Sequence, residues 1–290
     1  MAWLKTAQDV SRKALNIRGF RSCSFDSSVS KIHYFDAQSK GGLPPFIFLH
    51  GIGSSANGFS ALLPKVKRAT KRLLAPDSPG HGGSSVPENG FDLDTIYAGL
   101  VEFLDAKIER LGEPIFLYGS SLGGAMSLKY AMERPQNLRG LLLSSPAGAP
   151  IPEEEMEQLK ELFQMRSRHD ARYFLNRLFH KRPWYSRLIE PIFFQLMSRS
   201  HIEDFFDSVQ DSSQAFTPEQ LGALEMPLLL MWGESERILP ASCLHYYKEH
   251  LPEHAKIEIP EGVGHSPHIE RPGVMARRII QFANGVVEGA

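Results

Sequence analysis

The sequence predicts an α/β fold with a mostly parallel central sheet, helices on both faces and a helical insertion. Short, strongly apolar runs typical of buried parallel strands alternate with helical stretches along most of the chain. The alternation breaks at residues 145–150, no strand signal follows from 151 to about 216, and the alternation resumes at residue 226. With 290 residues, 42% of them hydrophobic and 22% charged, the chain can bury a large core. We therefore assign residues 1–150 and 217–290 to one core domain and residues 151–216 to an insertion.

The N-terminal part predicts a helix followed by a β-hairpin. Residues 3–17 place apolar side chains on one side of a helix, which packs on the domain surface or, as the alternative, makes a weak membrane contact. Two β-like stretches, 20–25 and 31–35, flank a turn at residues 26–28. This pattern is typical of a hairpin.

The strands of the core follow as continuous apolar runs. They cover residues 46–49, 72–76, 115–118, 138–144, 226–232 and 256–259. Helical stretches are expected at residues 93–111, 125–132 and 274–282. In the insertion we expect only helices, at residues 153–163, 171–179, 185–197 and 202–209.

One strand-to-helix junction carries the strongest functional pattern. Gly119-Ser120-Ser121-Leu122-Gly123 lies between the apolar run 115–118 and the helical stretch 125–132. A serine flanked by glycines between a strand and a helix is the context of a G-x-S-x-G nucleophile elbow. That template puts Ser121, not Ser120, at the tip, where the amides and dipole of the next helix face developing negative charge. The alternative is a glycine-rich turn with an incidental serine.

A serine hydroxyl is a weak nucleophile, so it needs a base, and the base needs an orienting acid. In elbow enzymes the chain order is serine, acid, histidine. We predict His265, in the loop after the last strand, as the base, with His268 as second choice. We predict Glu236, in the loop after strand 226–232, as the acid, with Glu234 as the fallback. The alternative is that both glutamates are solvated loop charges.

An oxyanion hole needs two backbone N–H groups aimed at one point. One is expected from Leu122, the residue after the nucleophile, and the other from the loop at residues 50–53. In that loop Ile52 is the first choice and Gly53 the second. His50 is expected to bond to nearby backbone rather than to react, and the alternative for the whole loop is a simple glycine turn.

Together these motifs resemble the α/β-hydrolase family over all of the chain except the insertion. The motifs are H-G-x-G at His50, D-x-x-G-x-G at Asp77, G-x-S-x-G at Ser121, a G-E-x-D-x-x-x-P loop at 233–240 and G-H-x-x-x-x-E-x-P at 264–272. The short helical lid and the Arg182-Pro183-Trp184-Tyr185 run resemble the monoacylglycerol lipase and carboxylesterase branch. Where the family usually has aspartate, this chain has Glu236, whose side chain is one methylene longer.

The resemblance implies a serine hydrolase of carboxylic esters, with monoacylglycerols or short-to-medium acyl esters as substrates and no cofactor or metal. A carbon–carbon bond or other non-ester hydrolase is the alternative, and a non-catalytic ligand-binding module is less favoured. Discrimination between them requires a reaction with a serine-directed probe.

The insertion has a composition of its own. Seven cations, at positions 166, 168, 172, 177, 181, 182 and 187, are interleaved with aromatic side chains and precede the apolar run 188–197. A basic rim beside an apolar face suits a lid that admits acyl chains and meets anionic lipid. The alternative is a helical cap whose apolar side packs on the core.

Charge and cysteine content limit the other classes of function. A formal net charge of -1 gives no general attraction to nucleic acid. Cys23 and Cys243 fit no metal or redox spacing. The N-terminus lacks the apolar segment of a signal peptide, and no run of about 18 apolar residues predicts a spanning helix. We therefore expect a cytoplasmic protein, with peripheral membrane contact through the lid as an additional interaction.

Overall fold

The computed structural model describes residues 12–88, 90–184, 186–198, 205–206, 208–209 and 215–289. In this part of the chain eight strands form one sheet in the order β1-β2-β4-β3-β5-β6-β7-β8. The strands are β1 (Arg21–Asp26), β2 (Lys31–Gln38), β3 (Phe46–Leu49), β4 (Arg72–Pro76), β5 (Ile115–Ser120), β6 (Leu138–Ser144), β7 (Leu228–Met231) and β8 (Lys256–Glu258). The β1–β2 and β2–β4 pairs are antiparallel and the other pairs are parallel. The predicted hairpin and mostly parallel sheet are confirmed.

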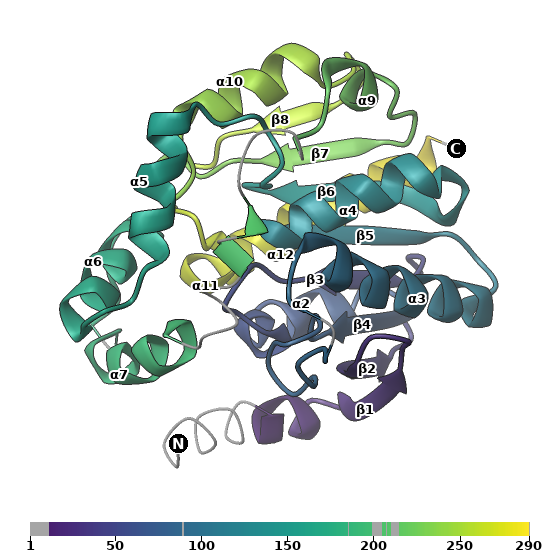
Figure 1. Cartoon of the computed structure of the whole chain (residues 1–290). Coiled ribbons are helices and arrows are strands. Elements are labelled where there is room, and N and C mark those ends of the chain that lie inside the picture. Colours follow the sequence, from purple (N-terminus) through teal and green to yellow (C-terminus); the bar gives the residue numbers. More distant parts are fainter. Residues whose placement is uncertain are drawn as a thin grey trace.

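Helices cover both faces of this sheet (Figure 1). Because side chains alternate along a strand, each central strand feeds two cores. In β3, Ile47 and Leu49 enter the core under the helices α3 (Leu93–Leu111) and α4 (Leu122–Glu133). Phe46 and Phe48 enter the opposite core, under α2 (Leu63–Lys67) and α12 (Pro272–Glu288). This double burial explains why the strands are apolar without interruption.

Local signals set the ends of the long helices. The Asp92 side chain accepts a hydrogen bond from the backbone N–H of Thr95 at 2.8 Å and caps the start of α3. Gly112, in the left-handed region with φ 71°, ends the same helix. Four shorter helices were not predicted: α2, α9 (Pro218–Gly222), α10 (Ala241–His250) and α11 (Pro267–Glu270). Of the ten residues in α10 only Cys243 and Tyr247 are buried, so its apolar periodicity is weak.

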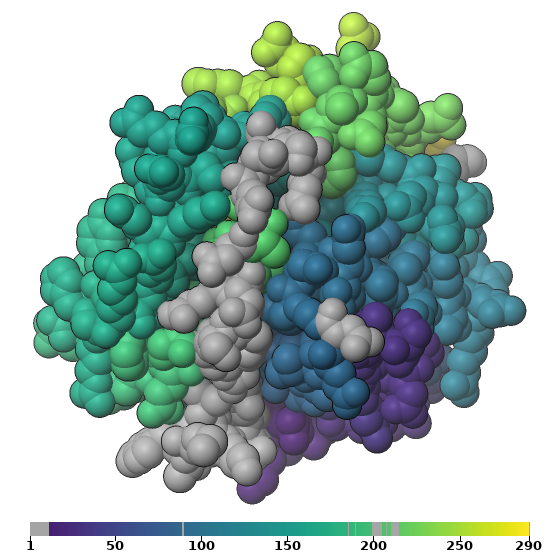
Figure 2. All heavy atoms as spheres, in the orientation of Figure 1, coloured from purple at the N-terminus to yellow at the C-terminus, as the bar shows by residue number. Residues whose placement is uncertain are grey.

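Three predicted helices lie between β6 and β7, off the carboxyl ends of the parallel strands (Figure 1). They are α5 (Glu153–Phe163), α6 (Arg168–Leu178) and α7 (Ser186–Met197), and they form one side of the molecule in the space-filling view (Figure 2). A capping box between Ser167 and Asp170 starts α6 three residues before the predicted start at 171. The expected helix at 202–209 and the first nine residues of the expected helix at 3–17 lie largely outside the described residues. No helix of the described part is long and apolar enough to cross a membrane.

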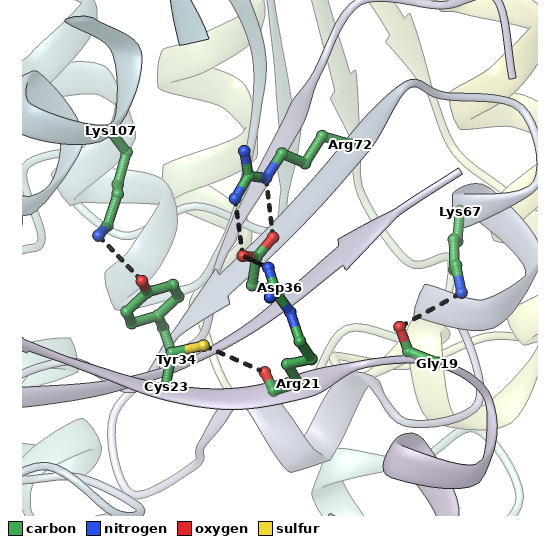
Figure 3. A network of polar contacts seen from close by, with 8 residues as sticks. All are labelled: Gly19, Arg21, Cys23, Tyr34, Asp36, Lys67, Arg72 and Lys107. Carbon is green, nitrogen blue, oxygen red and sulfur yellow. Dashed lines mark hydrogen bonds and ion pairs between the residues drawn. The ribbon is translucent and has the colours of Figure 1, made fainter. Parts of the chain in front are cut away.

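A buried carboxylate fastens the antiparallel edge of the sheet (Figure 3). Asp36 on β2 accepts two hydrogen bonds from Arg72 on β4, at 2.7 and 2.8 Å, and one from Arg21 on β1 at 3.0 Å. Burial alone would raise the pKa of Asp36, but the hydrogen bonds and charges of the two arginines lower it. Lys107 on α3 donates to the Tyr34 hydroxyl at 3.0 Å and ties that helix to the same edge. The edge strands are therefore held by polar contacts as well as by apolar packing.

Candidate active site

Ser121 occupies a sharp turn between β5 and α4. Its φ of 55° and ψ of -119° are a conformation that residues other than glycine rarely adopt. A Cβ on Gly119 would lie 2.4 Å from the Gly123 carbonyl oxygen, and a Cβ on Gly123 would lie 2.4 Å from that of Leu49. Both flanking positions therefore have no room for a side chain, because strand and helix pass too close. The turn has the geometry of a nucleophile elbow.

Ser121 lies where two cavities meet. A larger cavity of about 420 Å³ is lined by Ser121, Ile52 and Leu122, among others. A smaller one of about 300 Å³ is lined by Ser121, His265 and His268. In the described residues the backbone N–H groups of Ile52 and Leu122 donate to no protein acceptor. Leu122 is the first residue of α4, where amides lack intrahelical partners, so both amides are available to a bound oxygen.

The structure brings His265 and Glu236 together. The His265 Nδ1 and a Glu236 carboxylate oxygen are 2.7 Å apart, and both side chains are buried. The second oxygen of Glu236 accepts from the backbone N–H groups of Ile238 and Leu239, at 2.8 and 3.1 Å. Because a carboxylate only accepts, Nδ1 carries the proton and Nε2 remains an acceptor. Burial would raise the pKa of Glu236, but the charge and hydrogen bond of His265 and the Ile238 amide lower it.

The two fallback residues occupy other environments. Glu234 accepts a hydrogen bond from the backbone N–H of Gly262 at 3.0 Å in an exposed loop and is not brought to His265. His268 is buried with its ring 4.8 Å from that of Phe59. Burial, and then the charges of His265 and His50, lower the pKa of His268 to about 3, so this ring is neutral.

A buried network holds the loop that carries Ile52. Asp77 accepts from the backbone N–H groups of Ala56 and Gly83, at 2.6 and 2.8 Å, and lies 2.8 Å from His33 Nδ1. As expected, His50 bonds to backbone: its Nδ1 donates to the Gly51 carbonyl at 2.8 Å and its Nε2 accepts from the Ser78 N–H at 3.0 Å. Burial lowers the pKa of His50, which fits a neutral ring with one donor and one acceptor.

Asp77→Asn is expected to destabilise the protein by about 1–3 kcal/mol at neutral pH, because an amide cannot accept from three donors without turning its own NH₂ toward one of them. Burial would raise the pKa of Asp77, but the His33 hydrogen bond and the charges of His50 and His33 lower it. The ionised carboxylate thus contributes stability above the ordinary aspartate pKa, and this contribution is lost as pH falls through the folded-state pKa. Thermal melting at pH 7 and pH 3 measures both effects. Asp26→Asn, at the exposed end of β1, is the control, and equal melting temperatures for Asp77→Asn and wild type at pH 7 would contradict the expectation.

A further carboxylate joins the helical segment to the His265 loop. Glu270 accepts from the backbone N–H of Gly264 at 2.6 Å and from that of His180, just after α6, at 2.7 Å. A Cβ on Gly264 would lie 2.8 Å from the His180 nitrogen, so the two backbones touch. Arg177 donates to the Arg237 carbonyl at 2.7 Å, next to Glu236. Sequence reasoning missed these roles, since the only signal was the glutamate of the G-H-x-x-x-x-E-x-P motif.

Relatives of this chain carry several hydrolase names. Lipase 1 of Psychrobacter immobilis is 25% identical over 234 residues, which cover 78% of this chain and 72% of that protein. A 2-hydroxy-6-oxo-6-phenylhexa-2,4-dienoate hydrolase of Comamonas testosteroni is 29% identical over 230 residues, or 74% and 78% of the two chains. Monoacylglycerol lipase abhd6-B of Xenopus laevis is 24% identical over 279 residues, or 88% and 80%.

The solved structures agree in fold. The crystal structure of carboxylesterase CesB from Bacillus subtilis superposes with a TM-score of 0.80 at 19% identity, and the match covers 98% of each chain. A family model described as the alpha/beta hydrolase family matches residues 46–278, from the first parallel strand to the C-terminal helix. Since this match takes in the elbow and both loops that meet at it, the chain belongs to the alpha/beta hydrolase family.

Proposed function

We propose that the protein is a serine hydrolase that cleaves carboxylic esters through an acyl-enzyme intermediate. The observation that carries the proposal is the buried Glu236–His265 pair, whose histidine lines the same cavity as Ser121. In this mechanism His265 Nε2 takes the Ser121 proton as the hydroxyl oxygen attacks the ester carbonyl, and Glu236 stabilises the imidazolium that forms.

The remaining steps use the same groups. The Ile52 and Leu122 amides stabilise the oxyanion of the tetrahedral intermediate. His265 then gives its proton to the departing alkoxide, which leaves the acyl group on Ser121. A water molecule, deprotonated by His265 in turn, attacks the acyl-enzyme and releases the carboxylic acid and free Ser121.

Acylglycerols or similar short-to-medium acyl esters are the proposed substrates. The larger cavity has mainly apolar walls, including Met126, Leu159 and Phe163, which suits an alkyl chain. Relatives named as lipases, including a monoacylglycerol lipase, support the same class. A non-ester hydrolase is the second candidate, and the Comamonas testosteroni relative supports it.

The test combines covalent labelling with a substrate panel. A fluorophosphonate probe should label Ser121, whereas a non-catalytic binding module would leave the probe unreacted. Rates are then measured for p-nitrophenyl esters, monoacylglycerols and 2-hydroxy-6-oxo-6-phenylhexa-2,4-dienoate. Faster turnover of the dienoate than of every ester would reject ester hydrolysis in favour of the second candidate.

We further propose that residues 151–216 form a lid that touches anionic membranes. Residues of α5, α6 and α7 line the cavities beside Ser121. The basic rim expected from the sequence is smaller than its composition suggests, because Arg172 and Arg182 both pair with the buried Glu190, at 3.1 Å each. An exposed patch lies around the start of α7. It consists of Lys181, Trp184, Arg187 and Leu188, with Trp184 85% and Leu188 70% exposed.

This patch predicts a salt-sensitive reaction at anionic interfaces. Hydrolysis of an ester in anionic vesicles should fall with added salt more than hydrolysis of a soluble ester, because screening shortens to about 8 Å at physiological ionic strength. The double variant Lys181→Glu and Arg187→Glu should remove the difference, and Lys65→Glu on α2 is the matched control. Equal salt sensitivity of the two substrates in the wild type would end this proposal.

A further inference from the structure

The two cavities at Ser121 differ in their access to the base. His265 lines the smaller cavity and not the larger one. An alkoxide can take a proton from His265 only if it leaves on the side where the imidazole lies. The alcohol of the substrate therefore belongs in the smaller cavity, and the acyl chain belongs in the larger one.

We infer that the larger cavity is an acyl channel along α4 that accepts a straight chain of about 8 carbons and gains nothing from longer ones. This inference rests on the proposed serine mechanism and adds to it the place of the acyl chain and a limit on its length. The walls of the channel, its length and its far end each support the inference.

One face of α4 forms the floor of the channel. The lining residues on this helix are Leu122, Ala125, Met126, Lys129, Met132 and Glu133. Their spacing of three and four residues puts them on one side of the helix, beginning next to Ser121. At a rise of 1.5 Å per residue, the floor from Leu122 to Lys129, its first charged residue, is about 10 Å long. A fully staggered alkyl chain advances about 1.3 Å per carbon, so about 8 carbons span this floor.

Apolar side chains from other elements complete the channel. Leu159 and Phe163 come from α5, and Phe206 and Phe216 precede β7. The near part of the channel has no charged side chain on α4, since Ala125 and Met126 are the residues next to Leu122 that face it. Each methylene group of the acyl chain that binds here moves from water to an apolar surface. Binding of the substrate therefore becomes more favourable as the chain lengthens.

Charged groups end the apolar path. Lys129 pairs with Asp94 at 3.2 Å and lies 4.3 Å from the centroid of the Tyr97 ring. The Tyr97 hydroxyl donates to Glu133 at 2.7 Å. The Asp94 side chain is 84% exposed, so this end of the channel meets water. A methyl group that passes Lys129 and Glu133 would either enter water or desolvate charges, and neither adds binding.

The inference predicts a break in the dependence of rate on chain length. For saturated p-nitrophenyl esters below their micelle concentrations, kcat/KM should rise roughly fourfold per methylene up to about 8 carbons and then level off. Ala125→Phe fills the channel one turn from Ser121, at about 6 Å, and should move the break to about 4 carbons, measured in each variant as kcat/KM relative to the acetate ester of the same variant. Lys129→Met should move the break to longer chains, and Lys129→Arg should leave it in place.

Two controls make the result decisive. Ala61→Phe, at an exposed position outside the channel, should keep the wild-type profile. For butyrate esters of alcohols of increasing length, kcat/KM relative to the methyl ester should depend on alcohol length in Ala125→Phe as it does in the wild type, because the alcohol occupies the other cavity. A profile without a break, or an Ala125→Phe variant that selects against long alcohols instead of long acyl chains, overturns the inference while Ser121 labelling still supports the hydrolase. Failure of the wild type to label or to cleave any ester would instead reject the proposed function, and the inference with it.

Discussion

Ser121→Ala is expected to abolish ester hydrolysis, with a loss of ~10⁴ to 10⁶ in rate, as for other nucleophile replacements. The reason is geometric. Ser121 stands at the tip of the strained turn and lines both cavities, next to the free amides of Ile52 and Leu122. Ser120 also lines the smaller cavity, but it is the last residue of β5, paired with Ser144 in the sheet, and it does not occupy the strained turn.

Ser120→Ala is the matched control and should keep substantial activity. The two variants differ by one position and remove the same hydroxyl, so general effects on folding are comparable. Steady-state hydrolysis of p-nitrophenyl butyrate and fluorophosphonate labelling are measured for both. If Ser120→Ala fails to label while Ser121→Ala still labels, the nucleophile has been assigned to the wrong serine.

Glu236→Gln is expected to lower the catalytic rate by roughly 10² to 10⁴, the upper figure following the analogous acid-to-amide change in other triads. In the wild type, one carboxylate oxygen lies 2.7 Å from His265 Nδ1 and fixes the tautomer of that ring. The other oxygen accepts hydrogen bonds from two backbone N–H groups. An amide of the same size has one acceptor oxygen. If that oxygen stays with the Ile238 and Leu239 amides, the NH₂ group faces His265 and favours the tautomer that cannot accept the Ser121 proton.

Two companion variants test the assignment of the acid. Glu236→Asp should keep more activity than Glu236→Gln, because the charge remains although the side chain is shorter. Glu234→Gln should have little effect, since an amide oxygen can still accept from the Gly262 N–H. A normal rate for Glu236→Gln together with an inactive Glu234→Gln variant would mean that the acid has been misassigned. Burst and steady-state rates at pH 7 distinguish these cases.

The parts of the fold that depend on burial could be predicted from sequence. Because the central strands are buried on both faces, their sequences are continuous apolar runs without alternating polar residues. Such runs are easy to recognise in the sequence. The elbow and its two partner loops were predictable because their glycines and polar residues lie close together in the sequence. Helix α10 was not, because it buries only two of its side chains and carries no clear period.

Contacts between distant segments could not be predicted. His33 supports Asp77 from β2, 44 positions earlier, and no local pattern marks it. Arg172 and Arg182 looked like a solvated basic rim, but both turn toward Glu190, whose burial a single sequence does not reveal. The link from Glu270 to His180 spans 90 positions. Such pairs depend on how the insertion docks, and docking is a tertiary property.

The junction at Gly264 fixes the segment after α6 against the His265 loop. Its backbone lies against that of His180 without any side chain between them, and Glu270 bonds to both. A swing of the whole insertion away from the core would pull His180 off this support and leave the His265 loop unbraced. Because Arg172 on α6 also pairs with Glu190 on α7, these two helices are tied to each other as well as to this junction. If the insertion were replaced by that of a relative, the new segment would need the same backbone conformation where His180 contacts Gly264. This requirement holds whichever substrate the new helices recognise.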